Sequence, residues 1–76
     1  MKIILESEIE GYLKSRGIMK SWLAEQLDVH NSYITKWCKN ENGQAHTVPS
    51  AQYLIHMKRI LNCTDEDLYK ITELDS

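Results

Sequence analysis

Two short segments with helical apolar spacing follow one another near the middle of the chain, separated by a very short turn. The first runs from about Lys20 to Leu27 and the second from about Asn31 to Lys39. Each places its apolar residues on one side of a helix. So short a turn prevents the two helices from lying antiparallel, so we expect them to cross at a large angle. The small side chain of Ala24 is placed for that crossing.

Three further segments favour helices, and each has a recognisable end signal. Apolar residues recur at helical spacing through LESEIEGYLKSR, from Leu5, and Gly17 stands where the C-terminal cap of this first helix belongs. Pro49 and Ser50 begin a fourth helix, and Thr64 caps a short fifth one whose first turn is acidic. The polar loop at 40–48 carries an Asn-Gly turn signal. The chain is therefore expected to form five short helices.

No strand-like alternation and no internal repeat is evident, so the predicted fold class is all-α. We expect one domain over residues 1–76, with a short C-terminal tail at 72–76. A chain of 76 residues buries only about 60–65% of its unfolded surface, which leaves little room for a deep catalytic pocket. No Ser-His-Asp or Cys-His grouping can be argued either, so we do not expect an enzyme.

Charge is distributed unevenly along the chain, whose formal net charge is −2. Residues 14–39 carry five cations against two carboxylates, a local charge of +3. Residues 1–13 are at −2 and residues 61–76 at −4. The overall sign argues weakly against a nucleic-acid partner. The basic middle segment is nevertheless compatible with one face turned toward phosphates.

Membrane, metal and cofactor functions have no support in the sequence. No apolar run approaches the roughly 18–20 residues that span a bilayer. The start MKIILESEIE becomes acidic too early for a signal peptide, so we expect a cytoplasmic protein. Cys38 and Cys63 have no closely spaced Cys or His partners, so neither zinc nor a disulfide is expected. No cofactor is expected.

Two sequence strings resemble one known family. WLAEQL is followed by V-x-x-x-x-I-x-x-W, and PSAQYLIHMKRILNCTDEDL comes later. Both strings, in this order and separation, are similar to those of the phage repressor/Cro-type (XRE-like) helix-turn-helix family. The resemblance runs from about Leu5 to Leu68. It implies a lambda-repressor-like DNA-binding domain with its helix-turn-helix at about 20–39.

The resemblance also implies a role for the polar residues of the second helix and its surroundings. In this family that helix enters the major groove of double-stranded DNA, where Lys with guanine and Asn with adenine are favoured pairings. The side chains expected to read bases are Asn31, Ser32, Thr35 and Lys36. Those expected to contact phosphates are Lys20, Lys39, Asn40 and His46. The implied function is a transcriptional regulator, a phage- or prophage-type repressor on a near-palindromic operator.

The sequence departs from the family pattern at four places. Asp28 stands where Gly is usual, and Met19 replaces a capping residue. His30 stands at the cap of the second helix, where Ser or Thr is common. Because Asn31 caps better, that helix could start one residue late. The loop from 40 to 49 is about five residues longer than expected, and it either carries polar side chains to phosphates or has no role.

Two apolar features leave alternatives open. Trp22 precedes the buried Leu23, and it either covers the rim of the core or contacts a partner. Leu68, Ile71 and Leu74 recur every third residue. They form either a last helix on the core or the seam of a weak homodimer. The alternative to a DNA-binding regulator is therefore a protein-binding accessory factor or anti-repressor with the same fold.

Overall fold

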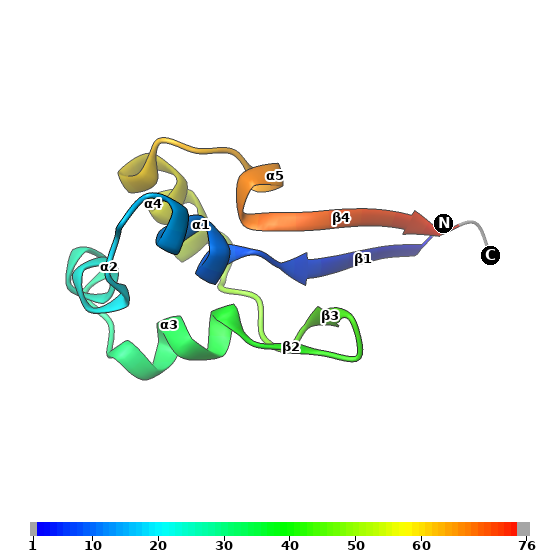
Figure 1. The fold of residues 1–76 in the computed structure, drawn as a ribbon, viewed down its shortest axis with the longest axis horizontal. Coiled ribbons are helices and arrows are strands. Elements are labelled where there is room, and N and C mark those ends of the chain that lie inside the picture. The colour runs from blue at the N-terminus through cyan, green and yellow to red at the C-terminus, as the bar shows by residue number, and fades with distance from the viewer. Residues whose placement is uncertain (1, 75–76) are drawn as a thin grey trace.

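The molecule has a helical body from which a two-stranded ribbon projects (Figure 1). The computed structural model describes residues 2–74. Its helices are α1 (Ile9–Ser15), α2 (Lys20–Leu27), α3 (Asn31–Cys38), α4 (Ala51–Leu61) and α5 (Asp65–Leu68). Its strands are β1 (Lys2–Ser7), β2 (Asn40–Glu41), β3 (Gln44–Ala45) and β4 (Tyr69–Leu74). We call β1 and β4 together the ribbon.

The predicted ends of α2 and α3 are confirmed to within one residue. Asp28 adopts the left-handed conformation (φ 56°), and its N–H donates to the carbonyls of Ala24 and Glu25 at the end of α2. His30 is extended, and its Nδ1 accepts the N–H of Ser32 at 3.2 Å. His30 is therefore the N-cap of α3, and the helix starts at its first expected position.

All five helices contribute to one apolar core, which also includes the first residue of β4. Its members are Ile9, Leu13, Leu23, Ala24, Leu27, Ile34, Trp37, Met57, Leu61, Leu68 and Tyr69. Ala24 is buried, as expected for a side chain at the crossing of α2 and α3. The Trp37 ring packs 5.7 Å, centroid to centroid, from Tyr53 of α4. This packing determines which side of α3 faces outward.

The all-α prediction is wrong, because the described residues include four strands in two antiparallel sheets. β1 pairs with β4 in a register that runs from Lys2 opposite Leu74 to Ser7 opposite Tyr69. Residues expected at the start of the first helix form β1, so α1 begins only at Ile9. The segment KIILES is rich in branched aliphatic residues, which pack well on a pleated surface once a partner strand is present.

The end of the described chain is extended rather than helical. α5 stops at Leu68, whose side chain is fully buried in the core. Ile71 and Leu74 are exposed on β4, and successive strand residues face opposite sides, so these two lie on opposite faces. The predicted homodimer seam is therefore not one surface. The first three residues of the predicted tail at 72–76 belong to β4, and residues 75–76 lie outside the described residues.

The polar loop predicted at 40–48 contains the β2–β3 hairpin. Asn42 and Gly43 form its turn with positive φ angles of 53° and 77°, as a two-residue hairpin turn requires. The turn signal is thus confirmed, whereas the two flanking strands were not predicted. The amide of Asn40 fastens this hairpin to the ribbon: its Oδ1 accepts the Ser7 N–H at 2.7 Å and its Nδ2 donates to the Ser7 carbonyl at 2.9 Å.

Candidate nucleic-acid interface

One side of α3 is exposed along the whole helix, on the opposite side of the body from α5 (Figure 1). Ile34 and Trp37 are buried in the core, and this fixes the orientation of the helix. The exposed side chains are Asn31, Ser32, Tyr33, Thr35 and Lys36. The structure therefore brings the four predicted base-reading residues together on one solvent-facing surface. We call this surface the α3 face.

The side chains of the α3 face differ in how free they are to bind a ligand. The Thr35 hydroxyl donates to the carbonyl of Asn31 at 3.3 Å, and the Ser32 hydroxyl lies 3.1 Å from Nδ1 of His30. Both hydroxyls thus engage the first turn of their own helix. Among the described residues, the Asn31 amide and the Lys36 ammonium have no hydrogen-bonded side-chain partner. Together with the exposed hydroxyl of Tyr33, these groups are the available donors of the face.

Tyr33 is an exposed member of the α3 face that the sequence reasoning missed. Its ring lies 5.7 Å from Nζ of Lys36 and 6.2 Å, centroid to centroid, from Trp37. A cation at this distance is attracted to the ring, so Tyr33 restrains the direction of the Lys36 side chain. The available signal was helical spacing, because Tyr33 directly precedes the buried Ile34 and so falls outside the apolar stripe.

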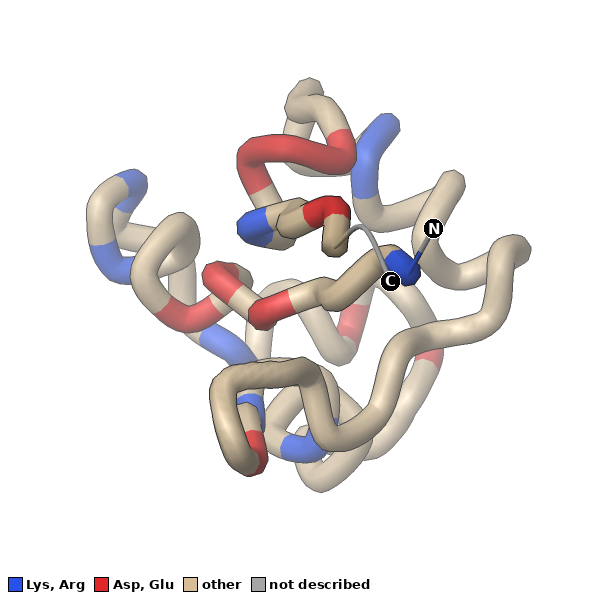
Figure 2. Tube along the Cα trace, turned by 90° about the vertical axis from the view of Figure 1, so that its right-hand side faces the viewer, with Lys and Arg blue, Asp and Glu red and all other residues tan. Residues whose placement is uncertain are grey.

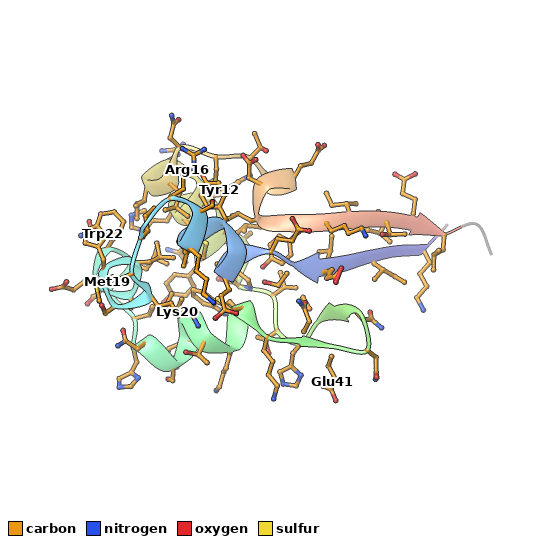
Figure 3. The ribbon with its side chains drawn as sticks, in the orientation of Figure 1. Tyr12, Arg16, Met19, Lys20, Trp22 and Glu41 are labelled. Atoms are coloured by element: carbon orange, nitrogen blue, oxygen red, sulfur yellow. The ribbon has the colours of Figure 1, made fainter. Side chains whose placement is uncertain are left out.

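Lys20, a predicted phosphate contact, is already paired within the protein. Its Nζ donates to Oε1 of Glu10 on α1 at 3.0 Å, and Figure 3 shows its side chain extending from α2 toward α3. The hydrogen bond holds the pKa of Glu10 below its usual value and raises the pKa of Lys20. Both side chains are solvent-accessible, so the ion pair is weak, and Lys20 can exchange Glu10 for another anion.

The remaining predicted phosphate contacts follow α3 in the hairpin region. Lys39 is exposed directly after the helix and has no ion-pair partner among the described residues. The Asn40 amide is occupied by the main chain of Ser7. Nδ1 of His46 lies 2.9 Å from Oε2 of Glu41, so its ring is also engaged. Lys39 is therefore the residue of this group most open to an anion.

One group of acidic side chains lies far from the α3 face. α5 carries three carboxylates, Asp65, Glu66 and Asp67, and the view of Figure 2 shows this acidic segment at the opposite end of the molecule from the cations of α3. Asp67 accepts the Thr64 N–H at 3.0 Å, which explains one carboxylate as a helix cap. The carboxylates of α5 therefore do not oppose an anion at α3, and Glu10 and Glu41, which lie closer to α3, are paired with Lys20 and His46.

A second exposed surface lies where α2 begins, and it is apolar. Met19 is 70% and Trp22 43% exposed, and Trp22 is not among the side chains packed against the core, so the structure does not show it covering the core rim. They line a shallow hollow of about 340 Å³ with Gly17 and Ile18. Figure 3 shows Arg16 next to Tyr12, and its guanidinium lies 5.1 Å from the ring centroid of Tyr12. We call Ile18, Met19 and Trp22 the α2 patch.

Two observations bear on metals and membranes. Within residues 2–74, no group of three His, Cys, Asp or Glu side chains is placed to hold a metal ion. In the same part of the chain, no helix combines the length and apolar character needed to cross a membrane. Cys38 and Cys63 are free thiols, and burial raises the pKa of each.

Comparisons with known proteins give one informative structural likeness. No protein-family model matches the chain, and no curated protein matches it. The fold is similar to that of the transcriptional regulator VanUg in its crystal form II, with a TM-score of 0.67 and 25% sequence identity. The match covers 95% of this chain and 89% of that one. It therefore includes both the helical body and the ribbon, and it supports a regulatory role for the protein.

Proposed function

We propose that the protein is a sequence-specific double-stranded DNA-binding protein that regulates transcription in the cytoplasm, and that it is not an enzyme. The observation that carries the proposal is the α3 face, a polar surface on a helix fixed by the buried Ile34 and Trp37. A helix fits the width of the major groove, and its polar side chains can then contact base edges. The likeness to a transcriptional regulator supports the same function.

In this proposal the side chains of Asn31 and Lys36 carry the sequence preference. Asn31 pairs with adenine and Lys36 with guanine, because their donors and acceptors match those base edges. Ser32 and Thr35 add weaker contacts, since their hydroxyls are partly engaged in α3. We further propose that the protein is a phage- or prophage-type repressor that occupies a near-palindromic operator.

Phosphate contacts are proposed to come from both sides of α3. Lys39 is open to a phosphate directly. Lys20 first has to leave Glu10, so the net gain from its contact is smaller than for Lys39. His46 and Asn40 contribute mainly by holding the hairpin beside the DNA backbone, because their side chains are bonded within the protein.

Selection from a random duplex pool, followed by fluorescence anisotropy at two salt concentrations, tests the proposal. Lys36→Ala should weaken binding to the selected site by about 1–3 kcal/mol and relax preference at one base pair. Lys39→Ala should weaken all sequences alike and lower the salt slope by about one. Lys70→Ala, which removes the same charge from the ribbon, is the control and should change neither. Absence of salt-dependent binding would refute the proposal.

A protein-binding accessory factor or anti-repressor is a second candidate, and the α2 patch favours it. Met and Trp are common anchors in protein interfaces, and Met19 and Trp22 are both exposed. This candidate predicts that Trp22→Ala removes capture of a partner protein while Lys36→Ala does not. The DNA-binding proposal predicts that Trp22→Ala leaves affinity for duplex DNA within about twofold, because the patch lies off the α3 face.

A further inference from the structure

One ion pair joins the first two helices beside the α3 face. Nζ of Lys20, the first residue of α2, donates to Oε1 of Glu10 on α1 at 3.0 Å. Figure 3 shows the Lys20 side chain extending from α2 toward α3. Burial raises the pKa of the Cys38 thiol at the end of α3, and the charges of Lys20 and Glu10 also act on this thiol. The pair therefore lies near the end of α3 that leads into Lys39.

The two lysines predicted to contact phosphate differ in whether the protein already supplies them with an anion. Lys39 has no ion-pair partner in the described part of the chain, whereas Lys20 has Glu10. The side chains of Lys20 and Glu10 are 36% and 49% exposed, so water and other ions reach the pair, and it is weak. Such a pair can exchange partners without any rearrangement of the fold.

A DNA phosphate that binds Lys20 has to come close to Glu10. The ammonium group has three N–H donors, so it could bind the phosphate next to the carboxylate or in its place. Two anions bound to one nitrogen at about 3 Å each would lie only about 5 Å apart, and like charges at that distance repel one another. Exchange is less unfavourable, because the exposed Glu10 side chain can then turn toward water. In either arrangement the carboxylate opposes the phosphate.

We propose that Glu10 competes with DNA phosphate for Lys20, and that it thereby lowers the affinity of the protein for every duplex. The competition does not depend on base sequence, because Lys20 lies at the start of α2, outside the α3 face. A larger share of the affinity at a preferred site therefore comes from contacts with bases. The proposal rests on the proposed function, since it concerns the same DNA-binding surface, and it gives Glu10 a role in setting the strength of that surface.

Replacing the carboxylate with an amide of the same size is the first test. In fluorescence anisotropy, Glu10→Gln should tighten binding to a random duplex and to the selected site alike, by about two- to fivefold, the range expected for an exposed ion pair. Glu66→Gln removes the same charge from α5, far from the α3 face. This control should leave both affinities unchanged, because salt screens exposed charges that lie more than about 10 Å apart. An unchanged affinity in Glu10→Gln would overturn the proposal.

A double-mutant cycle separates competition from a purely structural role of Glu10. In the wild type, a phosphate contact at Lys20 replaces the contact with Glu10, so Lys20→Ala should weaken binding only slightly. In the Glu10→Gln background the phosphate contact replaces nothing of comparable strength, so the loss caused by Lys20→Ala should be about two- to fivefold larger. Equal losses in the two backgrounds would show that Lys20 keeps Glu10 on DNA, and would overturn the proposal.

The ion pair itself can be measured on the full chain without DNA. The hydrogen bond from Lys20 and the charge of Lys20 hold the pKa of Glu10 below its usual value. NMR titration of the Glu10 carboxyl carbon should therefore give a higher pKa in Lys20→Ala than in the wild type. The same pKa in both proteins would mean that the pair is absent in solution, and would overturn the proposal whatever the DNA measurements show.

Titration of the same carbon in the DNA complex distinguishes failure of the competition from failure of DNA binding. Once Lys20 has moved to a phosphate, Glu10 lies beside the DNA backbone without its cation, so its pKa should be higher in the complex than in the free protein. An unchanged pKa in a complex that forms would overturn the proposal and leave the proposed function intact. If the wild type binds no duplex although Lys20→Ala raises the pKa of Glu10, the ion pair is present and the proposed function fails together with the competition.

Discussion

The α2–α3 pair is stabilised by contacts between residues that are close together in the chain. The ribbon is stabilised by contacts between residues that are far apart in the chain. The helix pair closes within residues 20–38, through a left-handed turn at Asp28 and a capped α3. The ribbon joins residues 2–7 to residues 69–74, so it forms only when nearly the whole chain has folded. The side chains of the pair are fully buried where they meet, as Ile34 is, whereas the apolar side chains of the ribbon tip are half exposed. Because its side chains are more fully buried, we expect the helix pair to be the more stable part. We also expect it to form earlier, because short-range contacts form faster than long-range ones.

The largest expected difference between the two regions comes from truncating one isoleucine in each. Ile34→Ala should lower the free energy of unfolding by about 2–5 kcal/mol, because it leaves a cavity in the core. Ile71→Ala should lower it by less than about 1 kcal/mol, since that side chain is 43% exposed. Urea denaturation of both variants measures the two losses. Equal losses would show that the ribbon is part of the core in energetic terms.

Alkaline pH should lower the stability of the fold through Tyr69, which lies where the ribbon joins the helical body. Burial raises the pKa of Tyr69 from its usual 10.0 to about 12, and its side chain is 3% exposed. The unfolded chain therefore loses this proton first, so stability should fall as pH rises from about 10 to 12, by about 2–3 kcal/mol from this residue.

Tyr69→Phe isolates that contribution from other groups that titrate in the same range. The hydroxyl of Tyr69 is buried without a hydrogen-bond partner among the described residues. The variant should therefore be as stable as the wild type, or more stable, at neutral pH. Its stability should also decline less steeply above pH 10, as thermal melts across this range would show. Parallel pH profiles for the two proteins would contradict the prediction.

The Asn40 amide links the ribbon to the segment that follows α3, next to the Ser7 hydroxyl, which donates to the Trp37 carbonyl of α3 at 2.7 Å. Removing the Asn40 amide should loosen the ribbon. Asn40→Ala deletes two hydrogen bonds to Ser7 and should cost about 1–3 kcal/mol. Hydrogen exchange should accelerate in β1 and β4 while α2 and α3 keep their protection. Gln44→Ala, in the same hairpin, is the control and should change neither. A uniform acceleration would mean that the ribbon and the helix pair unfold together.

The smallest expected effect lies in the turn of the helix pair. Asp28 has a φ of 56°, a conformation that costs most L-residues about 1–2 kcal/mol and glycine nothing. Asp28→Gly should therefore be about 1 kcal/mol more stable than Asp28→Ala, measured by thermal melts of the two variants side by side. Equal melting temperatures would indicate that the turn relaxes to another conformation.

The sequence was informative where local physics decides the structure. The period of Leu23, Leu27, Ile34 and Trp37 placed α2 and α3, and Asn42-Gly43 placed a turn. The ribbon was missed because its strands have partners more than sixty residues away. Leu68, Ile71 and Leu74 happen to recur every third residue, which imitates a helix. A short stretch of sequence does not distinguish this spacing from that of a β-strand, in which residues on the same face as the buried Tyr69 alternate with residues on the opposite face.

The candidate site shows the same difference between what local sequence determines and what long-range packing determines. Helical periodicity predicted which side chains share the α3 face, because that depends on α3 alone. The engagement of individual groups was not predictable. Glu10 holds Lys20 from a different helix, and Ser7 holds Asn40 across 33 residues. Both depend on how distant segments pack. Sequence therefore predicted the positions of the polar groups better than it predicted which of them are free.

The ribbon also brings the two ends of the described chain together. Lys2 and Leu74 are opposite one another in the β1–β4 register, which places their Cα atoms about 5 Å apart. A peptide of a few residues could join them into a closed ring without disturbing the body. Such backbone cyclisation would stabilise the fold by restricting the unfolded chain, by roughly 4 kcal/mol for a loop of this length. The same proximity suits the protein for insertion into a surface loop of another domain, which would leave α3 pointing away from the junction.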